Sequence, residues 1–232
     1  MPASYVQRFL GAREAFAFEI RQASNGMIAG LTVAAGQLSA LPDGATALVT
    51  SADRFSSPRW DRWQSIASLF LADAGAAVVL SRQPGFARLL STGHASEADM
   101  EGLARASDWE RQPAASQHSG KLDSSIETMQ RISLEATRQA LTAAGLTIAD
   151  IGHVLLPAFG RALLDFILEP YRIDLKRTNW SYARNVGHAG ACDIVLGLDH
   201  LQRTGDLQSG AYVLLAGIGA GHNATSHVLQ IT

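Results

Sequence analysis

The sequence predicts an α/β layered fold with buried strands, because apolar runs of strand length alternate with segments of helical character. Residues 46–51 (TALVTS) and 75–81 (GAAVVLS) are apolar runs bounded by turn or polar residues. Of 232 residues, 47% are hydrophobic and only 17% are charged. Such a chain can bury a substantial core, and its composition excludes intrinsic disorder.

The other expected elements follow from local patterns. Further strands are predicted at residues 15–20, 154–157, 212–216 and 226–231, and helices at residues 25–38, 159–168 and 191–201. A longer helix is expected to begin at Ser124, because Ser124 and Glu127 have capping-box spacing, and to end at Gly145. The polar segment 103–121 predicts an exposed loop or lid.

The composition also limits the class of function. The formal net charge is -2, so we expect no binding to nucleic acid or to an anionic membrane. The single cysteine, Cys192, excludes a disulfide framework and is typical of a reducing cytoplasm. No signal peptide is evident and no apolar stretch is long enough to span a bilayer. The sequence predicts a soluble, cytoplasmic protein, and we expect neither a metal nor a bound cofactor.

Ser24 is the first candidate for chemistry, within residues 19–31 (EIRQASNGMIAGL). Here an expected strand turns into an expected helix, whose N-terminal N–H groups and dipole stabilise negative charge. An acylated nucleophile needs that place, because its tetrahedral intermediate carries an oxyanion. The alternative is that Ser24 is an ordinary helix N-cap.

His188 and Asp193 form the second candidate, in residues 185–193 (NVGHAGACD). A histidine can deprotonate a serine, and a carboxylate can fix its tautomer and stabilise the imidazolium. Alternatively, His188 is a loop residue and Asp193 is an acid favoured at a helix start. The glycine-rich turn at residues 217–221 (GIGAG) is the third candidate, as a source of a backbone N–H for an oxyanion or as a plain tight hairpin.

In their order and spacing, these segments resemble the ketoacyl synthase III-type enzymes of the thiolase superfamily. Residues 19–31 resemble the family's nucleophile strand–turn–helix, with Ser24 in place of the usual cysteine. Residues 72–80 (ADAGAAVVL) and 154–163 (VLLPAFGRAL) resemble two further family segments. The likeness covers nearly the whole chain, and it implies a thiolase-like layered fold (αβαβα).

The resemblance also implies the domain organisation. Residues 1–95 are expected to form the remainder of the N-terminal half with the nucleophile, residues 96–121 a polar lid, and residues 122–232 the C-terminal half. By comparison with the family, a strand–helix–strand–helix stretch is expected ahead of residues 2–10 (PASYVQRFL) and is not found in this sequence. Three explanations stay open: the chain is a fragment, its start was assigned too late, or a partner supplies the rest. The family forms homodimers, so a homodimer is implied here too.

Two departures from the family pattern bear on function. In ordinary members a histidine and an asparagine hold the malonyl thioester carbonyl during decarboxylation; the matching residues here are Ala158 and His188. Ala158 has no side-chain donor, whereas Ser24, His188 and Asp193 make a hydrolase-like triad. This pattern is similar to a branch of the family in polyketide and antibiotic pathways that moves acyl groups between carrier proteins or onto hydroxyl or sugar acceptors.

We therefore expect a two-step acyltransferase. Ser24, activated by His188, attacks the thioester of an acyl carrier protein or of coenzyme A, and Asp193 orients His188. The backbone N–H groups of Ser24 and Ala220 receive the oxyanion. His188 then deprotonates a small-molecule hydroxyl or thiol acceptor. Three alternatives stay open: a 3-oxoacyl-ACP synthase III-type condensing enzyme for starter units, an esterase or thioesterase, and a degenerate, non-catalytic subunit.

Overall fold

The computed structural model describes residues 1–58, 60–63, 69–100, 119–219 and 221–232. Its helices are α1 (Pro2–Phe9), α2 (Gly26–Ser39), α4 (Ser119–Ala144), α5 (Arg161–Leu168), α6 (Trp180–Val186) and α7 (Asp193–Thr204). Its strands are β1 (Thr46–Asp53), β2 (Ala74–Ser81), β3 (Ala87–Ser96), β4 (Ile151–Leu155), β5 (Tyr212–Gly219) and β6 (Asn223–Ile231).

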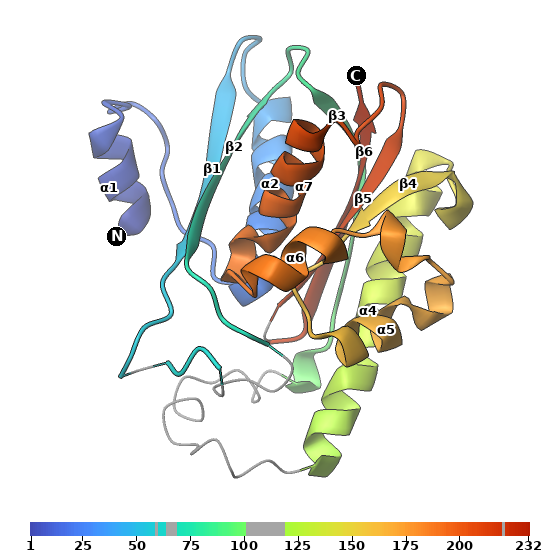
Figure 1. The fold of residues 1–232 in the computed structure, drawn as a ribbon. Coiled ribbons are helices and arrows are strands. Elements are labelled where there is room, and N and C mark those ends of the chain that lie inside the picture. The colour runs from blue at the N-terminus through green and yellow to red at the C-terminus, as the bar shows by residue number, and fades with distance from the viewer. Residues whose placement is uncertain (59, 64–68, 101–118, 220) are drawn as a thin grey trace.

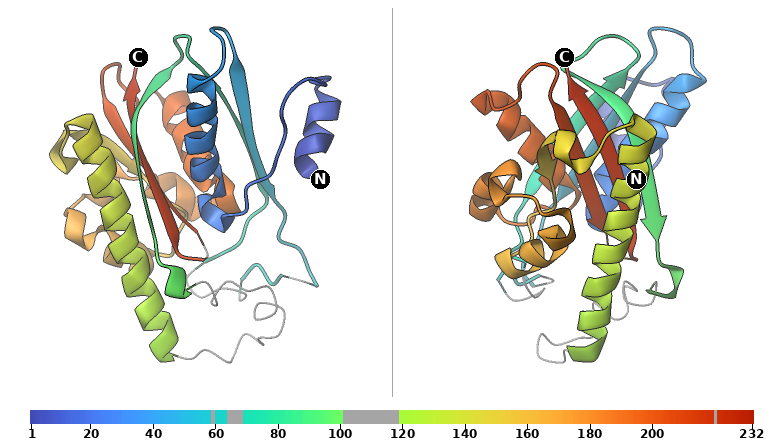
Figure 2. Two further views of the ribbon diagram at one scale, coloured as in Figure 1. Left: turned by 180° about the vertical axis from the view of Figure 1, so that it is seen from behind. Right: turned by 90° about the vertical axis from the view of Figure 1, so that its right-hand side faces the viewer.

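These elements form layers of sheet and helix (Figure 1). The antiparallel pair β1–β2 makes one sheet, and β3, β6, β5 and β4 make the other in that spatial order. Helices α2 and α7 lie between the two sheets, and α4 and α5 cover the opposite face of the four-stranded sheet (Figures 1 and 2). The result is the layered α/β fold expected from the sequence.

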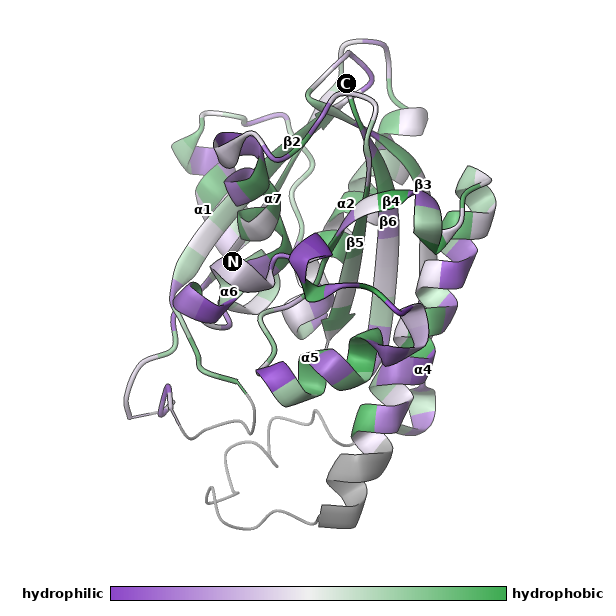
Figure 3. Cartoon of the chain, turned by 45° about the vertical axis from the view of Figure 1, so that its right-hand side comes forward, coloured by the Kyte–Doolittle hydropathy of each residue, from purple (hydrophilic) through white to green (hydrophobic). Residues whose placement is uncertain are grey.

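Apolar packing accounts for this arrangement. The strands β5 and β6 are buried almost throughout, because helices cover both faces of their sheet. One cluster of buried side chains, including Ile132 and Leu214, lies between this sheet and α4 and α5. A second cluster, including Ile28, Ile194 and Leu215, joins the sheet to α2 and α7. Helices α4 and α5 carry both hydrophobic and hydrophilic residues, as helices covering one face of a sheet should (Figure 3).

The sheet β1–β2 is covered on one face only. Val49 and Val78 point inward and pack against the cluster around α2 and α7. On the outer face Leu48 and Val79 are 43% and 68% exposed. Helix α1 lies apart from the layers and contributes no buried residue (Figure 1).

Most of the elements predicted from the sequence are confirmed. The helix expected at residues 25–38 is α2, and the strands expected at residues 46–51, 75–81, 212–216 and 226–231 lie within β1, β2, β5 and β6. Helix α4 ends at Ala144, and Gly145 adopts a φ of +67° that glycine favours.

Several boundaries were wrong. Helix α4 begins at Ser119, so Ser124 and Glu127 lie inside the helix and not at its start. The strand expected at residues 154–157 is β4, which begins and ends earlier in the sequence. The helices expected from residues 159 and 191 begin at Arg161 and Asp193. In each case the sequence pattern identifies the element correctly, but tertiary contacts determine where the helix or strand begins and ends. Of the loop or lid expected at residues 103–121, residues 103–118 lie outside the described residues, and residues 119–121 belong to α4 instead.

The strand expected at residues 15–20 is a larger error. The segment adopts no regular structure, and Phe16 and Phe18 are 83% and 45% exposed. A strand needs a neighbour to pair its N–H and C=O groups, and no described strand pairs with this segment.

Two elements were missed, β3 and α6. Strand β3 carries Ser, Thr, Gly and His in its middle, which is a turn-like composition. Gly93 is there because α4 packs onto it: a Cβ at this position would lie 2.1 Å from the Ala136 carbonyl oxygen. In the described part of the chain, no helix is long and apolar enough to cross a membrane.

His227 on β6 is a buried titratable group in this core. Its side chain is fully buried, and Nε2 lies 2.7 Å from the Thr32 hydroxyl on α2. Burial lowers the pKa of His227 from 6.5 to about 4, because a charged imidazolium loses its hydration there. Between these values the unfolded chain binds a proton that the folded protein does not, so stability falls as the pH decreases from 6.5 toward 4.

We therefore expect His227→Gln, which cannot be protonated, to reduce the acid sensitivity of the fold. Between about pH 7.5 and about pH 5, the wild type should lose about 2 kcal/mol more of its free energy of unfolding than the variant. Urea unfolding at several pH values measures this. His94→Gln, at an exposed position on β3, is the control. An equal change in both variants would contradict the assignment to His227.

Candidate active site

Ser24 lies in a single 3₁₀ turn, Ala23–Asn25, immediately before α2. Ala23 has a φ of +45°, a left-handed conformation that is uncommon for a residue other than glycine and that clusters at functional sites. The N-cap of α2 is Asn25, and Ser24 does not cap the helix. Its hydroxyl lies instead 2.8 Å from His188 Nε2. The N-cap interpretation of Ser24 is therefore wrong.

His188 is held by its backbone between α6 and α7. Its N–H donates to the Phe70 carbonyl at 2.6 Å, and its own carbonyl accepts from the Ala72 N–H at 2.8 Å. Gly187 makes this approach possible, because a Cβ there would lie 2.6 Å from the Phe70 carbonyl oxygen. The His188 side chain is almost completely buried. The backbone of His188 is thus fixed in place independently of Ser24.

Asp193, the first residue of α7, accepts three hydrogen bonds. Its Oδ2 lies 2.5 Å from His188 Nδ1 and accepts from the Ala158 N–H at 2.7 Å, and its Oδ1 accepts from the Ala189 N–H at 2.6 Å. The helix N-terminus also favours a negative charge. A buried carboxylate is stable when it is satisfied in this way.

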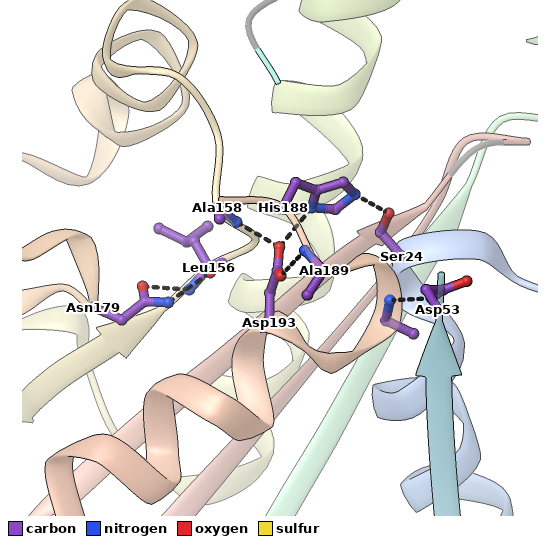
Figure 4. A network of polar contacts seen from close by, with 9 residues as sticks. Ser24, Asp53, Leu156, Ala158, Asn179, His188, Ala189 and Asp193 are labelled. Carbon is purple, nitrogen blue, oxygen red and sulfur yellow. Dashed lines mark hydrogen bonds and ion pairs between the residues drawn. The ribbon is translucent and has the colours of Figure 1, made fainter. Parts of the chain in front are cut away.

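Ser24, His188 and Asp193 thus form one hydrogen-bonded chain (Figure 4). Since the carboxylate of Asp193 accepts at Nδ1, we infer that Nδ1 carries the proton and that Nε2 is free to accept the Ser24 proton. The three residues selected from the sequence are therefore brought together, with Ser24 164 residues away from His188. This arrangement can deprotonate the serine and stabilise the imidazolium that results.

Ala158 lies beside these three hydrogen-bonded residues, at the position where the family resemblance places a histidine. It offers the site a methyl group and a backbone N–H, and that N–H is bonded to Asp193. Leu156, the residue directly after β4, is held by Asn179, whose amide bonds both the N–H and the C=O of Leu156, at 3.1 and 2.9 Å (Figure 4). Asn179 was missed in the sequence, because nothing local distinguishes it from other polar residues before a helix.

The expected oxyanion donors are located in part. The Ser24 N–H makes no hydrogen bond to any described carbonyl, and it lies just before α2. Ala220, the other expected donor, lies outside the described residues. Its neighbour Gly219 approaches the nucleophile turn closely, since a Cβ there would lie 2.1 Å from the Gln22 carbonyl oxygen. Residues 217–219 of the expected glycine-rich turn belong to β5, and Gly219 at the end of that strand is adjacent to the turn that holds Ser24.

A second serine–histidine pair lies outside the hydrogen-bonded chain of Ser24, His188 and Asp193. Ser125 Oγ on α4 is 2.8 Å from His222 Nε2. His222 Nδ1 is buried and has no hydrogen-bond partner in the described part of the chain. Burial is the main cause of the lowered pKa of His222. Among the described histidines, only His188 bridges a serine and a carboxylate. The described residues contain no cluster of three metal-ligating side chains.

Two family models match most of the chain. The family model described as 3-oxoacyl-[acyl-carrier-protein (ACP)] synthase III matches residues 18–97, and the model of the C-terminal part of that enzyme matches residues 141–231.

Several relatives cover nearly the whole chain. Beta-ketoacyl-[acyl-carrier-protein] synthase III of Acaryochloris marina (strain MBIC 11017) is 27% identical over an alignment 242 residues long. The alignment covers 98% of this chain and 71% of that protein. The acetoacetyl CoA synthase NphT7 of Streptomyces sp. (strain CL190) is 27% identical over 246 residues, with coverages of 98% and 71%. The solved structure of ChlB3, named as an acyltransferase, superposes with a TM-score of 0.90 at 32% identity, covering 100% of this chain and 72% of that one.

The chain belongs to the 3-oxoacyl-[acyl-carrier-protein] synthase III family, with the thiolase-like fold of its structural neighbours. It is an enzyme of the acyl-transferring or condensing type. The resemblance stated from the sequence motifs is thereby confirmed.

Proposed function

We propose that this enzyme transfers an acyl group from the thioester of an acyl carrier protein or of coenzyme A, through an ester on Ser24, to a hydroxyl or thiol acceptor in the biosynthesis of a polyketide or another secondary metabolite. The observation that carries the proposal is the chain of contacts Ser24 Oγ–His188 Nε2 and His188 Nδ1–Asp193 Oδ2, at 2.8 and 2.5 Å. It joins residues from both of the expected halves, 1–95 and 122–232.

The first step forms the acyl-enzyme. Ser24 Oγ attacks the thioester carbonyl carbon while its proton passes to His188 Nε2, and Asp193 stabilises the imidazolium. The Ser24 N–H, at the N-terminal end of α2, supports the negative carbonyl oxygen of the tetrahedral intermediate. When the intermediate collapses, the carbon–sulfur bond breaks and the leaving thiolate takes the proton from His188.

The second step moves the acyl group to the acceptor. His188 is neutral again and removes the proton of the acceptor hydroxyl or thiol, which attacks the carbonyl carbon of the Ser24 ester. The ester bond breaks, and Ser24 Oγ regains the proton from His188. Every proton in this cycle is moved by residues of the chain, so the proposed reaction uses neither a metal nor a further cofactor.

The surroundings of His188 favour acyl transfer over condensation. Condensation generates an enolate, whose charge must be met by donors at the malonyl carbonyl. Ala158 has no side-chain donor, and its N–H is already bonded to Asp193. Losing one such donor typically costs about 10²- to 10³-fold in rate. His188 is itself engaged with Ser24.

Condensation remains the second candidate, because of the relatives. Beta-ketoacyl-[acyl-carrier-protein] synthase III and acetoacetyl CoA synthase are names of condensing enzymes. In this second candidate, His188 serves both as the base for Ser24 and as the single donor to the malonyl carbonyl.

The proposed partners follow from the same family membership. Relatives carry the acyl carrier protein in their names, which supports it as a donor here. We also propose a homodimer. Strand β2 has one edge that pairs with no described strand, and the adjoining outer face exposes Leu48 and Val79. Such an edge and face favour association.

Ser24 should become covalently acylated by an acyl thioester. Intact-mass spectrometry after incubation with a panel of acyl thioesters should show an adduct that is lost in Ser24→Ala, because among the described serines only Ser24 contacts a histidine held by a carboxylate. Ser125→Ala is the matched control, since Ser125 also lies 2.8 Å from a histidine Nε2. It should keep the adduct. Labelling that persists in Ser24→Ala would refute the acyl-Ser24 intermediate.

The acylated enzyme should pass its acyl group to an alcohol or thiol and make no carbon–carbon bond. One reaction offers an acyl thioester with malonyl-carrier protein, and a parallel one offers a panel of hydroxyl acceptors. We expect ester formation in the second and no carbon dioxide release above background in the first. Carbon dioxide release coupled to a β-keto product would instead establish the second candidate. Rapid release of free acid without an acceptor would indicate a thioesterase.

A further inference from the structure

The residue after the proposed nucleophile is attached to the sheet behind it. Asn25 is fully buried, and its Nδ2 donates to Gln22 Oε1 at 2.8 Å and to Thr225 Oγ1 at 3.0 Å. Its backbone N–H donates to the Gln22 carbonyl at 3.0 Å. Both protons of the side-chain amide are thus used to close the turn on itself and to fasten it to β6.

The attachment point on β6 is a rigid one. Thr225 is paired with Gly217 of β5 on one side and with His94 of β3 on the other, so it lies in the interior of the four-stranded sheet. Its side chain is buried. A hydroxyl held by a strand with two neighbours is a fixed reference for the turn that bonds to it.

Two glycines of β5 let the turn lie directly on this sheet. A Cβ at position 217 would lie 2.5 Å from Asn25 Oδ1. A Cβ at position 219 would lie 2.1 Å from the Gln22 carbonyl oxygen and 2.9 Å from Asn25 Cβ. The Ala23 backbone, at a φ of +45°, is therefore kept in a rarely populated conformation by contacts on the sheet side of the turn.

A contribution to the stability of the fold does not explain why an asparagine occupies position 25. Asn25 Oδ1 is buried without a hydrogen-bond partner in the described part of the chain. An unsatisfied buried acceptor destabilises a fold, and an apolar residue in the same space would avoid that cost. The two directed bonds from Nδ2 are what an apolar residue would lack.

We propose that Asn25 and Thr225 are positioning residues, which set the place of Ser24 Oγ relative to His188 Nε2. The proposal rests on the proposed role of Ser24 as nucleophile. His188 is anchored separately, by Phe70, Ala72 and Asp193, so the contact between serine and histidine joins two independently fixed parts. The geometry of this contact therefore depends on the bonds that Asn25 makes, which hold the turn with Ser24 in place. A displacement of about 1 Å at a reacting group costs on the order of 10²-fold in rate.

The test removes the anchoring hydroxyl with little change in shape. Thr225→Val removes the acceptor of the Asn25 bond, and Thr225→Ser retains a hydroxyl. The matched control is Thr137→Val. Thr137 is a buried threonine of α4 whose hydroxyl lies 3.0 Å from Ser226 Oγ, the neighbouring residue of β6. It has the same kind of bond to the same strand, with no link to the nucleophile turn.

The first readout is the single-turnover rate of acylation at saturating thioester. We expect Thr225→Val to be slower by about 10- to 100-fold with little change in the concentration giving half-maximal rate, and Thr225→Ser to be near the wild type. Thr137→Val should retain the wild-type rate even if it lowers the melting temperature by as much as Thr225→Val. Equal rate losses in Thr225→Val and Thr137→Val, or none in Thr225→Val, would overturn the proposal.

The second readout needs no acylation. Side-chain ¹⁵N NMR of histidine-labelled protein reports the hydrogen bond at His188 Nε2, with Ser24→Ala giving the value for a lost bond. Thr225→Val should move the His188 signal toward that value, and Thr137→Val should not. If the wild type forms no adduct, the proposed function fails while this readout still decides the positioning role. An unmoved His188 signal in Thr225→Val would refute that role.

Discussion

The contacts of one buried carboxylate determine the arrangement of the site. Asp193 accepts hydrogen bonds from the Ala158 and Ala189 backbones and contacts His188 Nδ1. It therefore links the segment after β4 and the segment before α7 to the imidazole of the proposed base, His188. An isolated charge would be costly at this depth. The same donors that make its burial tolerable also fix the orientation of the histidine ring, and so the fold and the proposed chemistry depend on the same bonds.

The comparison of the two serine–histidine pairs shows what the carboxylate adds. Ser24 and Ser125 lie equally far, 2.8 Å, from the Nε2 atoms of His188 and His222. His222 Nδ1 has no partner among the described residues, whereas His188 Nδ1 contacts Asp193. A base whose Nδ1 has no such partner lacks a fixed tautomer and a carboxylate in contact with its ring. The proposed function therefore needs Asp193 in addition to Ser24 and His188.

Local sequence patterns made Ser24, His188 and Asp193 candidates, because each lies near the start of an expected helix, and the family resemblance joined the three into one site. The same patterns predicted most of the sheets and helices. Residues whose role depends on distant contacts could not be found in this way: Asn179 bonds Leu156, 23 residues earlier, and Asn25 bonds Thr225, 200 residues later. The expected strand at residues 15–20 failed for a related reason, since pairing depends on a neighbour that no local pattern reveals.

The central claim is that Ser24, His188 and Asp193 act as one unit in acyl transfer. Pre-steady-state release of thiol from an acyl thioester tests it, in the wild type, His188→Ala, Asp193→Ala and the double variant. Losses within one catalytic unit do not add, so the double variant should be no slower than His188→Ala alone, which should approach Ser24→Ala. Losses that multiply in the double variant, or a wild-type rate in His188→Ala, would contradict the account.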